Sequence, residues 1–312
     1  MSQPKLIKNL YGHQQVFNKI MNDVNEGKKS SMSYLLSGKK GVGKASLVYA
    51  IAKELLDKQK IEQECEPDFI VIEKLYDTNK KKYKKEITIN EVRKINRFLS
   101  LSSNSDKWRI VLVDSACEMN RNAANSILKI LEEPPKKTLI FLLNHNGRLL
   151  PTIRSRCQKI SLNNLKQEDI KNIIFENYQD AINIEPAKLD EIIEFSQGSA
   201  GLSFELLEQS YYNIFEQIND ILNNLNSHKF KQLRELTDNM TKLSNGFKLV
   251  NLILQNFIVD KIKDCIRQNN TENIEQLFAL RESFFKEVLD LEIFNLDQKS
   301  FIINKISTLK KL

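Results

Sequence analysis

Short apolar runs of strand length alternate with helical patterns over the first half of the chain. The apolar runs lie at 34–36, 69–72, 109–113 and 139–143, and the helical patterns between them lie at 44–58, 89–99 and 120–133. Strands that alternate with helices in this way form a parallel sheet with crossover helices. The first half of the chain is therefore predicted to be an α/β domain.

The second half has a purely helical pattern. All six prolines precede residue 187, so uninterrupted helices are allowed after it. Apolar residues recur over 247–263 at the spacing of one helix face, at Phe247, Val250, Leu254, Ile258 and Ile262. Similar patterns cover 204–224 and 272–292. Residues 208–312 are therefore predicted to form an all-helical bundle, whose apolar faces are either internal core or a subunit surface.

Charge separates the same two halves. Lys and Arg number 47 and Asp and Glu 40, and residues 208–312 hold 14 of each, so the whole net charge of +7 lies in 1–207. A basic front favours a polyanionic partner, and a neutral tail favours a protein partner. An uneven solvated surface explains the charge equally well. The lysine run between Lys80 and Lys85 is most simply an exposed loop, with a phosphate contact as its alternative.

Cysteine and histidine positions argue against a metal centre. The four cysteines are 40 or more positions apart, and the three histidines are also scattered, so no pair has the spacing of zinc ligands. The first residues contain no apolar signal segment, and no window is apolar enough for a membrane span. We expect a cytoplasmic protein with no metal and no membrane contact.

Three of only nine glycines fall within six residues, at Gly38, Gly41 and Gly43, and Lys44 follows. Glycines after a strand and before a helix let backbone N–H groups surround a phosphate, and a lysine at this point reaches the β and γ phosphates. The segment fits the P-loop pattern until its last position, where Ala45 replaces the hydroxyl that holds magnesium. The alternative is a glycine-rich turn with no ligand.

The strand at 109–113 ends in Asp114, which has the place of the acid that holds magnesium in P-loop ATPases. The next position, usually a carboxylate that activates water, is Ser115, and a hydroxyl is a poor general base near neutral pH. Glu118 could substitute, although a surface helical glutamate is the more ordinary interpretation. Ala45 and Ser115 together argue against hydrolysis.

The most specific segment runs from Asn122 through Lys129, Glu132-Glu133-Pro134-Pro135 and the strand at 139–143 to Arg154-Ser155-Arg156-Cys157. It resembles the clamp-loader branch of the AAA+ ATPases, whose members end a helix in Glu-Glu-Pro-Pro and carry a Ser-Arg-Cys motif. Further resemblances lie at Gly12-His13-Gln14, Glu66-Pro67-Asp68-Phe69 and Gly198-Ser199-Ala200-Gly201.

This resemblance implies three domains. The first is an α/β AAA+ module with a P-loop and a parallel sheet at 1–161, the second a small helical lid at 162–207, and the third an all-α C-terminal collar at 208–312. In the collar, Phe247, Val250 and Leu254 are candidates for subunit contact.

Departures from the family pattern imply the kind of subunit. Motor subunits of the gamma or tau type would have a P-loop hydroxyl, an acid pair after the second strand and a lid arginine, and this chain has Ala45, Ser115 and Leu202 there. The resemblance thus implies a non-hydrolysing subunit that requires no cofactor. Because Gly43, Lys44 and Asp114 are kept, weak ATP or ADP binding stays open. Only Cys65 lies where some members have a zinc module, so no zinc is expected.

The resemblance also implies roles for individual residues. Arg156 matches an arginine finger, which acts in trans on the ATP site of an adjacent subunit, and Arg154 is expected to be structural. Asn120, Arg121 and Asn122 are candidate contacts to DNA phosphates, with helix capping as their ordinary alternative.

The implied partners are gamma- or tau-type motor subunits, a delta subunit, a sliding clamp and primer–template DNA. Two other functions stay open: an active ATPase that uses Lys44, Asp114 and Glu118, and a loader-derived interaction protein outside replication.

Overall fold

The computed structural model divides the chain into two compact units, Met1–Phe204 and Glu205–Leu312. The residues that it describes are 9–26, 31–77, 82–100, 107–145, 147–178, 181–225, 230–268, 271–294 and 296–310. The predicted boundary at 161, between the AAA+ module and the lid, stays a prediction, as does the start of the collar at 208.

The first unit contains the predicted parallel sheet. Its strands, in spatial order, are β2 (Phe69–Ile72), β5 (Arg109–Val113), β6 (Thr138–Asn144), β1 (Ser31–Ser37) and β7 (Gln158–Ser161). All neighbouring strands of this sheet are parallel. The fold class predicted from the sequence is confirmed, and β7 is an additional strand.

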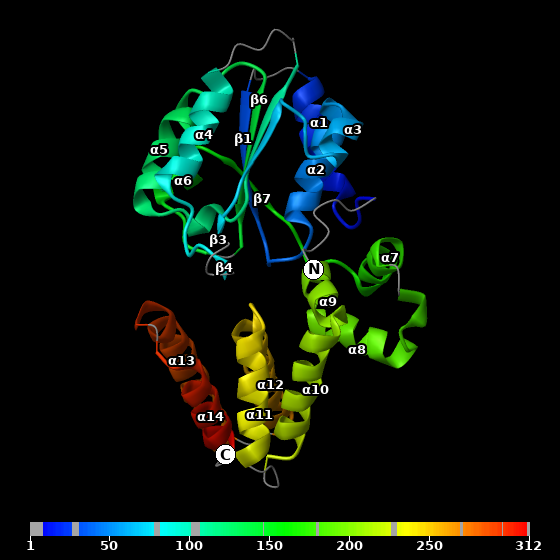
Figure 1. Ribbon diagram of the computed structural model, residues 1–312, viewed down its shortest axis with the longest axis vertical. Coiled ribbons are helices and arrows are strands. Elements are labelled where there is room, and N and C mark those ends of the chain that lie inside the picture. The colour runs from blue at the N-terminus through cyan, green and yellow to red at the C-terminus, as the bar shows by residue number, and fades with distance from the viewer. Residues whose placement is uncertain are drawn as a thin grey trace. The chain divides into compact units, whose positions relative to one another are not determined.

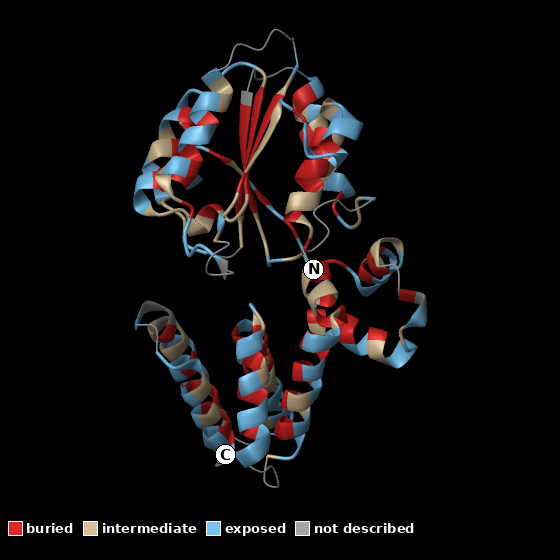
Figure 2. Cartoon of the chain, in the orientation of Figure 1, coloured by how far each residue is buried: buried red, intermediate tan, exposed pale blue. Residues whose placement is uncertain are grey.

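Alternating residues of the central strands build one core on each face of the sheet. Tyr34, Leu36 and Phe141 pack on one face, whereas Leu35 and Leu142 belong to the core on the other. Successive side chains of a strand point to opposite faces, so a strand covered on both sides must be apolar throughout. Figure 2 shows these strands as mainly buried and the outward faces of the helices as exposed.

Helices cover both faces of the sheet (Figure 1). On one side lie α1 (Gln14–Asn25), α2 (Lys44–Leu55) and α3 (Lys58–Glu62). On the other lie α4 (Ile89–Ser100), α5 (Arg121–Glu132) and α6 (Pro151–Arg154), and a 3-10 turn, η1 (Ala116–Glu118), precedes α5. The P-loop helix and the Ser-Arg-Cys segment are therefore attached to opposite faces of the sheet.

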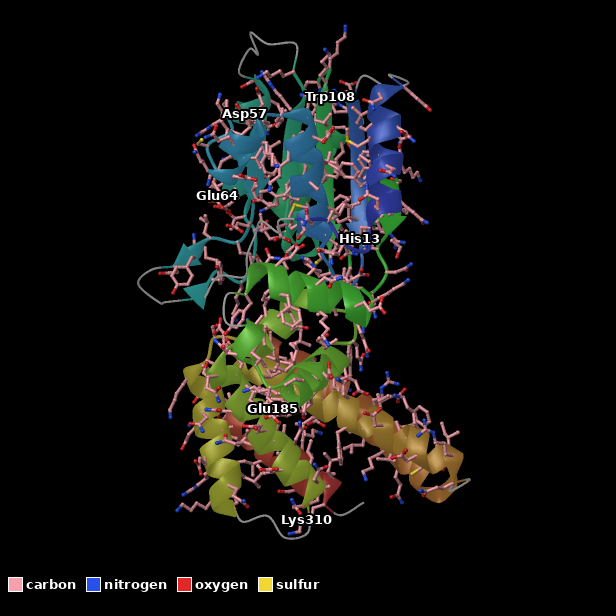
Figure 3. The ribbon with its side chains drawn as sticks, turned by 90° about the vertical axis from the view of Figure 1, so that its right-hand side faces the viewer. His13, Asp57, Glu64, Trp108, Glu185 and Lys310 are labelled. Carbon is pink, nitrogen blue, oxygen red and sulfur yellow. The ribbon has the colours of Figure 1, made fainter. Side chains whose placement is uncertain are left out.

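The helix predicted over 44–58 is shorter than expected. Leu56 has an extended backbone, and the Asp57 side chain accepts hydrogen bonds from the amides of Gln59 and Lys60 (Figure 3). An aspartate with this geometry is an N-cap, so it begins a second helix, α3, and ends the first.

The lysine run is not simply a loop. Tyr76–Asp77 (β3) and Lys82–Tyr83 (β4) pair as an antiparallel two-stranded sheet, and the rings of Tyr76 and Tyr83 meet edge to face with centroids 5.2 Å apart. Lys84 and Lys85 are exposed, as predicted. Lys80 and Lys81 lie outside the described residues.

Further helices complete the first unit: α7 (Gln167–Asn177), the 3-10 turn η2 (Ala181–Asn183), α8 (Pro186–Ser196) and α9 (Ala200–Leu207). The boundary between the units falls within α9. The second unit continues with α10 (Gln209–Asn223), α11 (Phe230–Lys242), α12 (Gly246–Arg267), α13 (Thr271–Phe294) and α14 (Gln298–Leu309). The all-helical prediction for this region is confirmed.

The apolar stripe of α12 is internal core. Val250 and Leu254 are fully buried and Phe247 nearly so, because α10, α11 and α13 all pack against α12. The expectation that these three residues offer a subunit contact is therefore wrong. Among the described residues of the second unit, the exposed large apolar side chains are Phe230, Ile266, Phe278, Phe285, Phe294 and Leu296. Among the described helices, none combines the length and apolarity that crossing a bilayer requires.

Candidate nucleotide loop and arginine site

The loop between β1 and α2 has the shape of a phosphate loop. Gly41 and Gly43 have φ of 82° and 96°, a conformation that residues with a side chain rarely adopt. A Cβ at Gly41 would also lie 2.3 Å from Ser199 Oγ, so a larger residue would displace the neighbouring segment. The strand, turn and helix predicted around the glycines are all present.

The Lys44 ammonium donates hydrogen bonds within its own loop. Its side chain is buried, and Nζ donates to the carbonyl oxygens of Gly38 at 2.7 Å and Lys39 at 2.5 Å. Burial lowers the pKa of Lys44 to about 8, although the nearby Asp114 carboxylate opposes that shift. Two of the three ammonium donors are therefore used within the chain.

The start of α9 covers the same loop from outside. The Gly201 amide donates to the Gly41 carbonyl at 3.0 Å, and Ser199 Oγ donates to the Lys40 carbonyl at 2.9 Å. The motif at 198–201 thus contacts the glycine-rich turn directly. Leu202, at the position where the resemblance implies an arginine in motor subunits, is partly buried and brings no charge to the loop.

His13 fixes the loop from its other end. It is buried, and Nε2 donates to the Val42 carbonyl at 2.7 Å (Figure 3). Burial lowers the pKa of His13, which favours the neutral ring. The segment at 12–14 that resembles the adenine-side entry of the family is therefore also a structural support of the P-loop.

Asp114 has a partner that the sequence analysis missed. His145 follows β6 directly, and its Nε2 lies 3.0 Å from Asp114 Oδ1. Burial alone would raise the pKa of Asp114, but the hydrogen bond and charge of His145, together with Lys44, lower it overall. Because β5 and β6 are parallel neighbours, the residues after their carboxyl ends meet at one edge. Knowing that these two strands are neighbours would therefore have been enough to predict that Asp114 and His145 lie close together.

Neither Ser115, at the position of the usual carboxylate, nor its possible substitute Glu118 is arranged as a general base. Ser115 adopts a left-handed backbone with φ of 64° and begins the 3-10 turn. The Glu118 carboxylate pairs with Lys74, with 2.8 Å between Oε2 and Nζ. Glu118 is thus the partner of a lysine cation.

The three candidate DNA contacts lie together at the start of α5. Asn120 is the N-cap, and its Oδ1 accepts from the Ala123 amide at 3.0 Å. Arg121 and Asn122 are exposed, and neither side chain bonds to any residue that the structure describes. Arg121 also lines a cavity of about 330 Å³ together with Arg148.

Arg156 is held between two helix ends. Its Nη2 forms an ion pair with Glu132 Oε1 at the end of α5, and its Nη1 donates to the Thr152 carbonyl of α6 at 2.9 Å. Ile153 and Cys157, which flank residues 154–156, belong to the core on the sheet face away from α2. Arg154 is exposed and makes no side-chain bond with a described residue, so its expected structural role has no contact to support it.

The structure places no three His, Cys, Asp or Glu side chains of the described residues where they could hold a metal ion. All four cysteines are free, and Cys157 is buried, which raises the pKa of its thiol to about 11. Cys65 is exposed and unpaired with another cysteine.

A protein-family profile described as "DNA polymerase III, delta subunit" matches residues 12–166. Among curated proteins, the chain is 28% identical over 233 residues to DNA polymerase III subunit gamma of Buchnera aphidicola, covering 70% of this chain and 61% of that protein. It is 35% identical over 140 residues to subunit delta' of Pseudomonas aeruginosa, covering 40% and 41%, and 29% identical over 188 residues to subunit delta' of Bacillus subtilis, covering 56% and 51%. The matched parts thus span about two fifths to three fifths of these relatives.

Among solved structures, a DNA polymerase III gamma subunit-related protein from Thermotoga maritima matches with a TM-score of 0.53. The match covers 94% of this chain and 98% of that one at 19% sequence identity. At this identity the likeness speaks for the fold alone.

Proposed function

The chain belongs to the clamp-loader family of DNA polymerase III, and on that premise we propose that it is a non-hydrolysing, delta prime-like subunit of the bacterial loader. It would help to place the sliding clamp on primed DNA and would supply Arg156 to the ATP site of a neighbouring motor subunit. Its partners would be gamma- or tau-type subunits, a delta subunit, the clamp and primer–template DNA, all in the cytoplasm.

The state of its own phosphate loop supports the absence of hydrolysis. Lys44 and the carbonyls around it bond to one another, and Ala45 offers no hydroxyl for magnesium. Asp114 is paired with His145, and Glu118 is paired with Lys74. ATP hydrolysis in P-loop enzymes needs a metal-bound phosphate and a polarised water. The residues of this loop therefore do not fit a magnesium nucleotide that is to be hydrolysed.

The position of Arg156 is the observation that carries the proposed role in trans. The P-loop leads into α2 on one face of the sheet, whereas Arg156 follows α6 on the other (Figure 1). A guanidinium that acts on the γ-phosphate of a different subunit must face away from the chain's own loop. A finger of this kind neutralises negative charge as it develops in the transition state.

The alternative is an active motor subunit of the gamma or tau type. It is favoured by the Buchnera gamma relative, whose match covers more of this chain than do the matches of the two delta' relatives. The two functions differ in the activity of the purified chain: a motor subunit would release phosphate from ATP in the presence of primed DNA, and the proposed subunit would not.

We expect Arg156→Ala to lower the ATPase of a reconstituted loader by about 10³-fold or more at the affected site, which is the range measured for trans-acting fingers. Total turnover falls less, since the other ATP sites remain. The measurement is steady-state phosphate release with clamp and primed DNA.

Arg154→Ala is the matched control, because Arg154 is an exposed arginine two positions away that bonds to no described residue. Equal turnover for wild type and Arg156→Ala would refute the finger role, and DNA-stimulated phosphate release by the chain alone would favour the motor subunit.

A further inference from the structure

Arg156 is fixed before any neighbouring subunit is present. One side of its guanidinium meets the Glu132 carboxylate, and the other meets the Thr152 carbonyl at 2.9 Å, with Ser155 Oγ at 3.5 Å. Thr152 belongs to a four-residue helix, and its carbonyl oxygen also accepts a hydrogen bond from Ser155 Oγ at 3.0 Å. The ends of α5 and α6, which pack together, thus converge on one side chain.

These contacts leave donors for another ligand. A guanidinium has five N–H groups in a rigid plane, and the contacts within the chain use at most three of them. Nε and one N–H of Nη2 are therefore not used in these contacts. The Arg156 side chain is therefore restrained, but its hydrogen-bond donors are not all used in these contacts. The side chain remains 33% exposed.

Without Arg156 as its partner, the Glu132 carboxylate would be in an electrostatically unfavourable position. Glu132 is the last residue of α5, where the partial negative charge of the helix end repels a carboxylate. Glu133, the next residue, is also exposed but bonds to no described residue. Of two adjacent glutamates, one is thus paired with Arg156 and the other is not.

We propose that Glu132 is a positioning residue for the arginine finger: it holds the Arg156 guanidinium at the end of α5 so that its remaining N–H groups meet the phosphate of the adjacent subunit. The inference rests on the proposed function of Arg156 in trans. An unrestrained arginine loses side-chain entropy when it docks, and prior restraint by Glu132 and Thr152 reduces that loss.

The test uses the complete reconstituted loader with clamp, primed DNA and ATP. We expect Glu132→Ala to lower kcat about three- to fivefold, the factor that corresponds to the upper range of exposed ion pairs, with KM for ATP almost unchanged. Glu132→Gln keeps an acceptor oxygen and should lose less. Glu133→Ala is the matched control and should match wild type.

A double-mutant comparison separates positioning from a general structural effect. In an Arg156→Ala background, Glu132→Ala should cause no further loss, because its effect passes through that arginine. A loss of the same size in both backgrounds would show a structural role and overturn the proposal. Assembly of each variant is checked by its elution with the motor subunit.

Two further outcomes are decisive. If Arg156→Ala lowers turnover and Glu132→Ala leaves it unchanged or raises it, Glu132 does not position the finger, although the finger itself stands. If Arg156→Ala changes nothing, the proposed function fails, and the positioning role fails with it.

Discussion

Lys44 and Asp114, the two charged residues of the predicted nucleotide site, both bond within the chain. Lys44 donates to loop carbonyls, and Asp114 accepts from His145. Without replacing these bonds, a phosphate could take only the third ammonium donor of Lys44, and a metal ion only the remaining lone pairs of Asp114. The glycine turn thus has the backbone conformation that a phosphate loop needs, while Lys44 and Asp114 already have partners within the chain.

The burial of Lys44 predicts a pH dependence of stability. The folded chain releases the Lys44 proton near pH 8, whereas an unfolded chain keeps it until about pH 10.4. Between these values the unfolded state binds more protons, so the contribution of Lys44 to the free energy of unfolding rises as pH increases. We expect wild type to gain stability relative to Lys44→Met from pH 8 to pH 10.

Denaturant unfolding at several pH values measures this difference. A flat difference for Lys44→Met would mean that its ammonium has an ordinary pKa and is not buried as described.

At the scale of whole elements, the sequence predicted most of what depends on local periodicity. The strands at 69–72 and 109–113 have the predicted bounds, and α12 contains its predicted stripe. The sequence did not predict contacts between elements that lie far apart along the chain. The Asp114–His145 pair needs the register of β5 and β6, and the burial of the α12 stripe needs the positions of three other helices.

The start of α5 combines two roles that mutations can separate. Asn120 caps the helix, and Arg121 is exposed beside it. We expect Asn120→Ala to lower the free energy of unfolding by about 1 kcal/mol and Asn120→Asp to retain it, because aspartate is an equally good cap. Arg121→Ala should leave stability within about 0.5 kcal/mol.

For DNA binding, in contrast to stability, the effect is expected at Arg121. If Arg121 meets a phosphate, Arg121→Ala lowers the affinity of the assembled loader for primed DNA and reduces the salt slope of binding by about 1. Asn122→Ala is compared beside it. An unaltered slope for both variants would assign the start of α5 to the fold alone.

At the scale of the molecule, the net positive charge lies in the first part of the chain, and the second unit exposes several phenylalanines. The net charge of +7 comes from residues 1–207, and the second unit exposes phenylalanines on α11 and α13 although its core is already filled. Exposed aromatic side chains of this size are typical of protein contacts. A basic front for DNA and an aromatic tail for subunits agree with the proposed place in a loader.

Two adjacent phenylalanines of α13 allow this division to be tested. Phe284 is 1% exposed and packs against Phe301 at a tilt of 53°, with ring centroids 5.4 Å apart, whereas Phe285 is 62% exposed. We expect Phe284→Ala to lower the free energy of unfolding by about 3–5 kcal/mol, as large core truncations do. Phe285→Ala should change it by less than about 0.5 kcal/mol.

For association with other subunits, we expect the exposed Phe285 to matter more than the buried Phe284. If the exposed face of α13 contacts another subunit, Phe285→Ala weakens association with the motor subunit by about 1 kcal/mol or more, since truncation of a buried aromatic anchor at an interface has this cost. Phe278→Ala, one heptad earlier on the same helix face, should act in the same direction. The measurement is the dissociation constant of the complex, taken where unfolding shows each variant folded. Unchanged association for both variants would place the subunit contact on a different surface of the second unit or of the first.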